Sequence, residues 1–322
     1  MGRILYVVIP CYNEEEVLPE TVKRLKKKFQ ALIREGLISE KSRIALVNDG
    51  SKDKTWELIE GYHREDSMIC GINLSRNRGH QNALLAGLMT VRKHADAVIS
   101  MDADLQDDIN AIDEMMEKYL DGCDIVYGVR SKRVTDSFFK RVTAEGFYRV
   151  MNWLGANTVF NHADYRLMSR RALDGLAEFR EVNLFLRGIV PMIGYRTDTV
   201  LYERSERFAG ESKYPLKKML SFALEGITSL SVKPIRLITS LGFLVFLASM
   251  IMFVYILVRF FTGNTVTGWS SVAASVWLIG GLTLLAIGIV GEYIGKIYLE
   301  VKQRPRFIID RFLHDDKDET GS

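Results

Sequence analysis

Cysteine is scarce in this chain of 322 residues, and positive charges outnumber negative charges only slightly. Cys11, Cys70 and Cys123 are odd in number, widely spaced and without a C-x-x-C pair. Such a pattern offers no disulfide framework, so we expect three free thiols in the cytosol. The formal net charge of +3 is too small to indicate a nucleic-acid partner. The five histidines form no metal-binding pattern.

Charge is missing altogether from two long stretches near the C-terminus. Leu237–Val258 and Phe260–Gly291 contain no charged residue. A transmembrane helix needs about 20 consecutive apolar residues, and both stretches are long enough. Lysines and arginines precede the first stretch and follow the second, whereas residues 262–271 between them are uncharged. The positive-inside rule therefore predicts two transmembrane helices with both termini in the cytosol.

Two further segments combine aromatic, aliphatic and basic residues. Phe138–Leu154 and Tyr214–Ser231 both have this composition, and the second leads into the first charge-free stretch. Amphipathic helices of this kind lie at a membrane surface. We expect that placement for both segments, and the alternative is that either one packs on the body of the protein as ordinary core.

The first 130 residues alternate between strand and helix patterns. Short β-branched runs predict strands, and amphipathic segments predict helices between them. The expected strands are 3–9, 43–47, 69–74, 97–101 and 124–128, and the expected helices are 14–34, 54–64, 79–93 and 109–120. Repeated β-α units favour an α/β fold with a mostly parallel sheet and helices on both faces.

Polar residues gather where four of these strands end, in Pro10–Glu14, Asn48–Ser51, Ser75–Gly79 and Asp102–Gln106. In open α/β sheets, ligands bind outside the carboxyl ends of the strands. We therefore expect the binding site at this edge of the sheet.

Asp102, Asp104 and Gln106 alternate along an extended segment, so their side chains share one face. Carboxylate and amide oxygens suit Mg²⁺ or Mn²⁺, which bridge to phosphate oxygens. We predict a divalent-metal site here, although acidic turns are also common. Asp107 and Asp108 follow directly. We expect them to cap the next helix, and the alternative is that they alter the preference for the ion.

Two of the other strand ends offer groups that suit a nucleoside. Asp49 is placed to accept a hydrogen bond from a base N–H, and Tyr12 is placed to stack on a base or pack beside it. The competing interpretation is ordinary turn chemistry, because Asn-Asp-Gly-Ser is a common turn sequence.

Together with Ser75–Gln81, the order and spacing of these motifs resemble the family-2 glycosyltransferases of GT-A fold. Ala163–Met168, Arg207–Tyr214 and Gly291–Tyr298 are similar to segments of the polyprenyl-phosphate glycosyltransferases. Within that group, the chain resembles the bactoprenol glucosyltransferase branch, which is related to dolichyl-phosphate mannose synthase. The resemblance covers nearly the whole chain and implies a Rossmann-like GT-A domain.

The resemblance also implies roles for individual residues. By position, the nucleoside is held by Pro10, Tyr12, Glu14 and Asp49, the diphosphate and metal by Asp102, Asp104 and Gln106, and the acceptor phosphate by Arg130, Arg207 and Lys213. Asp104 and Asp164 take the catalytic positions. Asp164 is a candidate base or positioner, and the alternative is that it only orients Arg166 or another nearby arginine.

The implied reaction is inverting transfer of a hexose from a nucleotide sugar to a polyprenyl phosphate, for later cell-envelope glycosylation. The expected donor is UDP-glucose and the expected acceptor undecaprenyl phosphate, at the cytosolic face of the cell membrane. UDP-N-acetylglucosamine, UDP-galactose and GDP-mannose stay open as donors. A different class, a non-catalytic membrane subunit, is disfavoured by the intact acidic set, and a processive polymer synthase needs more spans.

The expected organisation follows from these assignments. It comprises a catalytic domain over 1–213, an interfacial helix over 214–234, a two-helix anchor over 235–296 and a cytosolic tail over 297–322. A homo-oligomer, such as a tetramer, is implied by the resemblance.

Overall fold

The computed structural model describes residues 2–131, 162–182, 184–203 and 268–315, with isolated residues between 235 and 262. It divides the chain into two compact units. The first contains Met1–Val142, Thr158–Tyr214 and Arg304–Ser322, and the second contains Thr143–Asn157 and Pro215–Gln303. The two predicted amphipathic segments, 138–154 and 214–231, lie outside the described residues, as does part of the first charge-free stretch.

The described part of the first unit is built from strands and helices of ordinary length. Its strands are β1 Leu5–Cys11, β2 Arg43–Asn48, β3 Ile69–Leu74, β4 Ala97–Ser100, β5 Ile125–Arg130, β6 His162–Ser169, β7 Thr197–Tyr202 and β8 Ile309–Leu313. Its helices are α1 Leu18–Arg34, α2 Thr55–Glu65, α3 His80–Val91, α4 Ala111–Leu120, α6 Arg170–Ala177 and α7 Leu186–Met192.

These strands form one sheet in the order β7-β5-β6-β4-β1-β2-β3-β8. β4, β1, β2 and β3 are parallel neighbours, and β5 pairs in parallel with β7. β6 runs antiparallel between β4 and β5, and β8 runs antiparallel to β3. The prediction of an α/β fold with a mostly parallel sheet is confirmed. The carboxyl ends of β1, β2 and β4 and the amino end of β6 therefore meet at one edge.

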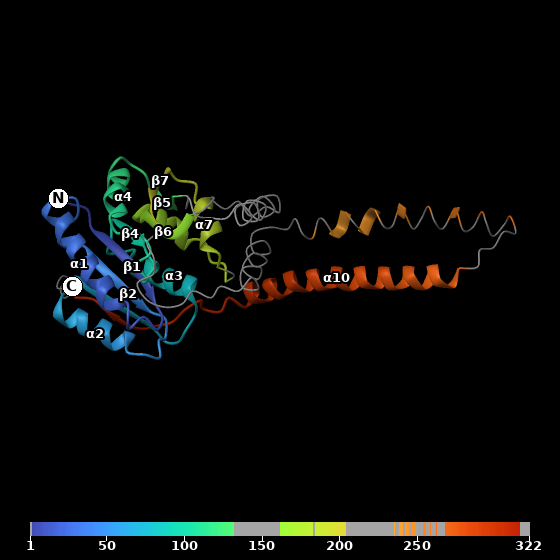
Figure 1. The fold of residues 1–322 in the computed structure, drawn as a ribbon, viewed down its shortest axis with the longest axis horizontal. Helices are drawn as coiled ribbons and strands as arrows, with labels where there is room; N and C mark the ends of the chain where they lie inside the picture. Colours follow the sequence, from blue (N-terminus) through green and yellow to red (C-terminus); the bar gives the residue numbers. More distant parts are fainter. Residues whose placement is uncertain are drawn as a thin grey trace. The chain divides into compact units, whose positions relative to one another are not determined.

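Helices cover both faces of the sheet, as Figure 1 shows. Alternate residues of β1 explain this, because successive side chains of a strand point to opposite faces. Leu5, Val7 and Ile9 pack with apolar residues of α1, α2 and α4. Tyr6 and Val8 pack with α3, α6 and α7 on the other face. All of β1 is buried, so the strand holds the loop that follows it on a rigid base.

The first helix begins later than its sequence pattern indicates. We expected it from residue 14, but α1 begins at Leu18. The backbone N–H of Glu14 donates to the hydroxyl of Thr55, and the N–H of Glu15 donates to the carboxylate of Asp53. These contacts with the start of α2 hold residues 13–15 as a loop, so the helix starts one turn later.

The C-terminal part differs from the prediction in two ways. Within the described residues, Ile279–Lys302 is the one helical segment long and apolar enough to cross a membrane, and none of its most apolar stretch is buried. Two such helices are therefore not established. The helix that contains this segment, α10, runs from Trp269 to Lys302. The expected tail also contributes a strand, β8, which joins the sheet beside β3.

Candidate active site

A cavity of about 190 Å³ opens at the carboxyl ends of β1 and β2. It is lined by Pro10, Tyr12, Glu14 and Asp49, together with Asn77, Gly79 and His80 where α3 begins. The four residues that the resemblance assigns to the nucleoside therefore line one cavity. Tyr12 is 43% exposed, so its ring is accessible from solvent.

Asp49 organises the floor of this cavity. It is almost fully buried, and its backbone N–H donates to the carbonyl of Cys11. Its two carboxylate oxygens accept the backbone N–H groups of Arg78 and Gly79, at 2.6 and 2.9 Å. Burial raises the pKa of Asp49 above its usual range, and these hydrogen bonds oppose the shift. Asp49 thus joins β1, β2 and the loop before α3, and each oxygen keeps a second lone pair for a ligand.

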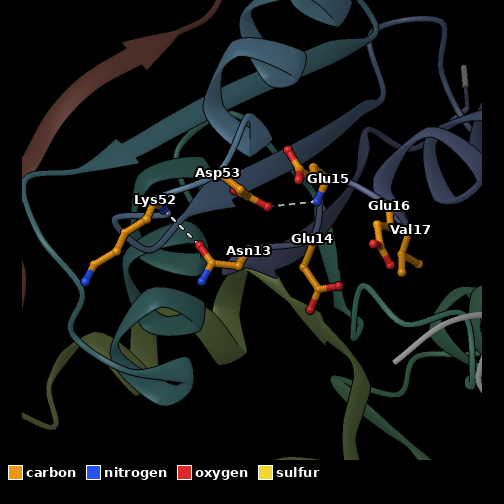
Figure 2. Close-up of a pocket in the computed structure, with 7 residues that line it drawn as sticks. All are labelled: Asn13, Glu14, Glu15, Glu16, Val17, Lys52 and Asp53. Atoms are coloured by element: carbon orange, nitrogen blue, oxygen red, sulfur yellow. Dashed lines mark hydrogen bonds between the residues drawn. The ribbon is translucent and has the colours of Figure 1, made fainter. Parts of the chain in front are cut away.

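A second, acidic cavity of about 390 Å³ lies beside the first. Figure 2 shows its lining, which consists of Asn13, Glu14, Glu15, Glu16, Val17, Lys52 and Asp53. The side chain of Asn13 accepts the backbone N–H of Lys52 at 2.8 Å. Asn13 has a positive φ of 54°, and this bond holds the residue in a conformation that asparagine tolerates better than most residues. Glu14 lines both cavities.

The predicted metal residues follow β4 in a turn rather than an extended strand. Leu105 has a positive φ of 56°, and the backbone N–H of Gln106 donates to the carboxylate of Asp104 at 3.2 Å. Burial, followed by the charges of Asp164 and Asp104, raises the pKa of Asp102. Within the ranges that the structure describes, no group of three or more His, Cys, Asp or Glu side chains is arranged to hold a metal ion.

The side chains of Asp102, Asp104 and Gln106 nevertheless offer the kind of ligand atoms that a hard divalent cation prefers. Asp102 and Asp104 offer carboxylate oxygens, and Gln106 offers an amide oxygen. Three oxygens are fewer than the six that Mg²⁺ takes, so phosphate or water oxygens would complete the shell. A cation would also relieve the crowding of negative charge that raises the pKa of Asp102.

Asp164 lies at the same edge, near the amino end of β6. The hydroxyl of Ser100 donates to its backbone carbonyl. Its carboxylate accepts hydrogen bonds from the buried Arg166 at 2.8 Å and from Arg187 of α7 at 3.1 Å. Burial opposes ionisation, but the nearby His80 and the two arginines hold the pKa of Asp164 well below its usual range. The carboxylate of Asp164 thus contacts both arginines, Arg166 and Arg187.

His80 connects this carboxylate to the predicted metal site. Its Nε2 lies 3.6 Å from an oxygen of Asp102 and 3.6 Å from an oxygen of Asp164. Burial by itself lowers the pKa of His80, but the nearby carboxylates of Asp164 and Asp102 raise it overall. When protonated, His80 would offset part of the negative charge of Asp102 and Asp164.

Asp107 corrects one prediction, because it does not cap the following helix. α4 begins at Ala111 with Asn110 as its N-cap. The carboxylate of the buried Asp107 accepts a hydrogen bond of 2.6 Å from the hydroxyl of Tyr202. Burial and the charge of Asp102 raise the pKa of Asp107 to about 6. The Nε of Arg130 donates to the same Tyr202 hydroxyl, which places Arg130 next to this edge. Asp108 accepts from the backbone of Asn110 and shapes the turn before the helix.

Comparison with known proteins assigns the family. The family model for glycosyl transferase family 2 matches residues 6–176, which is more than half of the chain. The chain belongs to glycosyl transferase family 2. It is a glycosyltransferase, and the matched residues contain nearly all of β1, the strands β2 to β6, the residues that line both cavities, and Asp102, Asp104 and Gln106.

Relatives match this glycosyltransferase over almost its full length. It is 54% identical to the uncharacterized glycosyltransferase YkoT of Bacillus subtilis, over 98% of this chain and 93% of the relative. It is 42% identical to the bactoprenol glucosyl transferase of Shigella phage SfII, over 95% of this chain and 97% of the relative.

Among solved structures, the mannosyltransferase PcManGT from Pyrobaculum calidifontis, in complex with GDP-Man and Mn²⁺, is 17% identical. It matches with a TM-score of 0.44, over 94% of this chain and 87% of that one. That likeness is too distant to place a ligand in this glycosyltransferase.

Sequence reasoning missed part of the site of the glycosyltransferase. Arg187 was not assigned a role, and His80, which stands in the motif 75–81 at the end of β3, was expected only to be a structural or substrate-edge residue. That position was the available signal for His80. No local pattern distinguishes Arg187 from other arginines. Arg207 and Lys213, which were assigned to the acceptor phosphate, lie outside the described residues.

Proposed function

We propose that this glycosyltransferase moves glucose from UDP-glucose to undecaprenyl phosphate at the cytosolic face of the cell membrane, for use in later cell-envelope glycosylation. The observation that carries the choice of sugar and acceptor is the match with bactoprenol glucosyl transferases at 42% identity over 95% of the chain. UDP-N-acetylglucosamine, UDP-galactose and GDP-mannose are the alternative donors.

The cavity at the ends of β1 and β2 suits the nucleoside of the donor. Tyr12 offers an exposed aromatic ring against which a base can stack, and Asp49 keeps free lone pairs for a base N–H. Pro10 and Glu14 complete the lining. β4 lies beside β1 in the sheet, and Asp102 follows β4 closely in the chain. A nucleoside in the cavity would therefore have its diphosphate near Asp102.

Asp102, Asp104 and Gln106 would hold a Mg²⁺ or Mn²⁺ ion together with the diphosphate. When bound, such an ion neutralises the charge of the departing nucleoside diphosphate. Asp164 is best suited to a positioning role, because Arg166, Arg187 and His80 already surround its carboxylate. The acceptor phosphate is ionised at neutral pH and needs little help from a general base, so orientation and charge stabilisation supply most of the rate.

The acceptor side of the proposal involves residues beside and beyond the described edge. Arg130 lies at the end of β5, where its guanidinium is joined to Tyr202. With Arg207 and Lys213, it would hold the lipid phosphate in line with the sugar, because guanidinium and ammonium groups bind phosphate strongly. The apolar segment Ile279–Lys302 supports attachment to a membrane, with two spans and both termini cytosolic as proposed from the sequence.

Transfer of radiolabel from UDP-glucose to undecaprenyl phosphate, in the presence of Mg²⁺, tests the proposal. We expect a lipid product with UDP-glucose, and its absence with all four nucleotide sugars would refute the function. Addition of EDTA should stop turnover, and an excess of Mn²⁺ or Mg²⁺ should restore it.

A pair of variants tests the metal residues. Asp104→Ala should abolish turnover, whereas Asp113→Ala, which only removes an ion pair with Lys28 on α1, should leave it intact. A near-normal rate for Asp104→Ala would remove the metal assignment. The homo-oligomer, proposed as a tetramer from the resemblance, is tested by analytical ultracentrifugation in detergent.

A further inference from the structure

A row of side-chain hydrogen bonds crosses the sheet from its C-terminal strand toward the donor cavity. The carboxylate of Asp310 in β8 accepts from the side-chain amide of Asn73 in β3 at 3.1 Å. The side-chain oxygen of Asn73 accepts from the side-chain amide of Asn48 in β2 at 2.7 Å. The side-chain oxygen of Asn48 then accepts the backbone N–H of Ser51 at 3.2 Å. We call Asp310, Asn73 and Asn48 the amide row.

The amide row ends on the turn that shapes the donor cavity. Ser51 accepts the backbone N–H of Asn13 at 3.0 Å, and Asn13 accepts the backbone N–H of Lys52 in return (Figure 2). Asn13 stands between Tyr12 and Glu14, which line the cavity. The same turn carries Asp49, whose carboxylate holds the loop on the opposite wall. Both walls are thus fastened to one turn, and the row fixes where that turn lies.

We propose that Asp310 and Asn73 are positioning residues for donor binding, through which the C-terminal strand sets the geometry of the nucleotide cavity. This inference rests on the proposed function, because the cavity is assigned there to the nucleoside. Neither residue lines the cavity, so each acts through Asn48 and its turn rather than by contact with the donor.

The two ends of the row differ in burial, and for this reason we expect the row to affect binding more than stability. The side chain of Asp310 is 51% exposed, so water replaces its hydrogen bond when the residue is removed, and little stability is lost. Asn48 is only 3% exposed, and its side-chain amide donates its hydrogen bond to Asn73. When Asn73 is no longer held from β8, its side chain can rotate, and the direction of the Asn48 amide is no longer set.

An exchange of amide and carboxylate between β3 and β8 provides the decisive test. In Asn73→Asp, the N–H group that donates to Asp310 is lost, and two carboxylates face each other. In the double variant Asn73→Asp/Asp310→Asn, the amide at position 310 donates to the carboxylate at position 73, which still accepts from Asn48. Asp310→Asn by itself keeps an acceptor oxygen. We therefore expect near-normal behaviour from Asp310→Asn and from the double variant, and a defect in Asn73→Asp and Asp310→Ala.

The measurements are steady-state kinetics with UDP-glucose and calorimetric binding of UDP with Mg²⁺, both on the full-length protein. Loss of a hydrogen bond in the row should raise the KM for the donor and the Kd for UDP about three- to tenfold. The kcat should stay within about twofold, because the row touches no reacting group.

Arg311→Ala is the matched control on the same strand. It removes the ion pairs of Arg311 with Glu60 and with Asp310 but leaves the bond between Asp310 and Asn73. Its KM should therefore equal that of the wild type.

The outcomes separate this inference from the proposed function. If the wild type neither binds UDP nor uses any donor, the proposed function fails. If the wild type binds and turns over, but Asp310→Ala and Asn73→Asp keep a normal KM, the positioning role is wrong. The role is also wrong if Arg311→Ala is as impaired as Asp310→Ala, or if the double variant is no better than Asn73→Asp.

Discussion

Gly50, in the turn after β2, is a position where a single methyl group should damage both stability and donor binding. Its φ is +64°, and a Cβ built there would lie 2.5 Å from the backbone nitrogen of Asn77 and 2.8 Å from the carbonyl carbon of Arg76. These are main-chain atoms, which cannot rotate away as a side chain can. In Gly50→Ala, therefore, the turn and the segment before α3 must move apart.

The cost has two parts that can be separated. A residue with a side chain in the left-handed region costs about 1–2 kcal/mol, and overpacking adds about 1–3 kcal/mol. Gly36→Ala is the matched control, because Gly36 has a φ of +73° and nothing within 4 Å of its Cβ position. The control should show only the conformational part. The displaced backbone in Gly50→Ala also leads directly into Arg78 and Gly79, whose N–H groups bind Asp49.

Thermal unfolding and donor kinetics, measured on both variants, test this reasoning. A difference of about 2 kcal/mol should separate their midpoints by roughly 4–8 °C in a domain of this size. Gly50→Ala should also raise the KM for UDP-glucose, whereas Gly36→Ala should not. Equal midpoints for the two variants, with an unchanged KM in both, would show that the close approach at Gly50 has no energetic weight.

Three other substitutions have definite expected results. Tyr202→Phe removes the hydroxyl bonded to the buried carboxylate of Asp107 and should lower the free energy of unfolding by about 1–3 kcal/mol; an unchanged denaturation midpoint would contradict this. Arg187→Ala removes two bonds to Asp164 and should slow turnover about ten- to hundredfold, with little loss of stability because Arg187 is 36% exposed; a normal kcat refutes it. Ile287→Lys places a charge within the apolar part of α10 at a cost of about 2.5–3.5 kcal/mol for insertion. It should therefore lower the fraction of protein that stays with the membranes after carbonate extraction, whereas Ile287→Leu should not.

The first five strands could be predicted from sequence because they are strongly apolar and regularly alternate with helices. β3 was predicted with its observed bounds, and the others were within a few residues. β6, β7 and β8 were missed. β6 carries His162, Asp164 and Arg166 among apolar residues, so its pattern resembles a functional motif more than a strand. Its place between β4 and β5 is determined by tertiary pairing that no local signal records.

The candidate site shows the same division between local and distant information. The cavity residues Tyr12 and Asp49 could be brought together in advance, because the ends of parallel strands share one edge. The bonds of Asp49 to the loop before α3 could not, since they depend on how α3 packs. The assignment of Asp107 to a helix cap failed for a related reason, because its partner, Tyr202, is supplied by β7.

The pairing of β8 with β3 has a consequence for the order of events during synthesis. Domains form from the N-terminus as the chain leaves the ribosome, yet the edge of β3 receives its partner only when Ile309–Leu313 appears. Until then β3 presents a free edge, and exposed edges invite pairing with other chains. Because α10 precedes β8 in the chain, the sheet receives this edge strand after the apolar helix has been made. The donor cavity should therefore gain the support of β8 only late in folding, and a newly made copy should bind the donor more weakly until its C-terminal strand has been added.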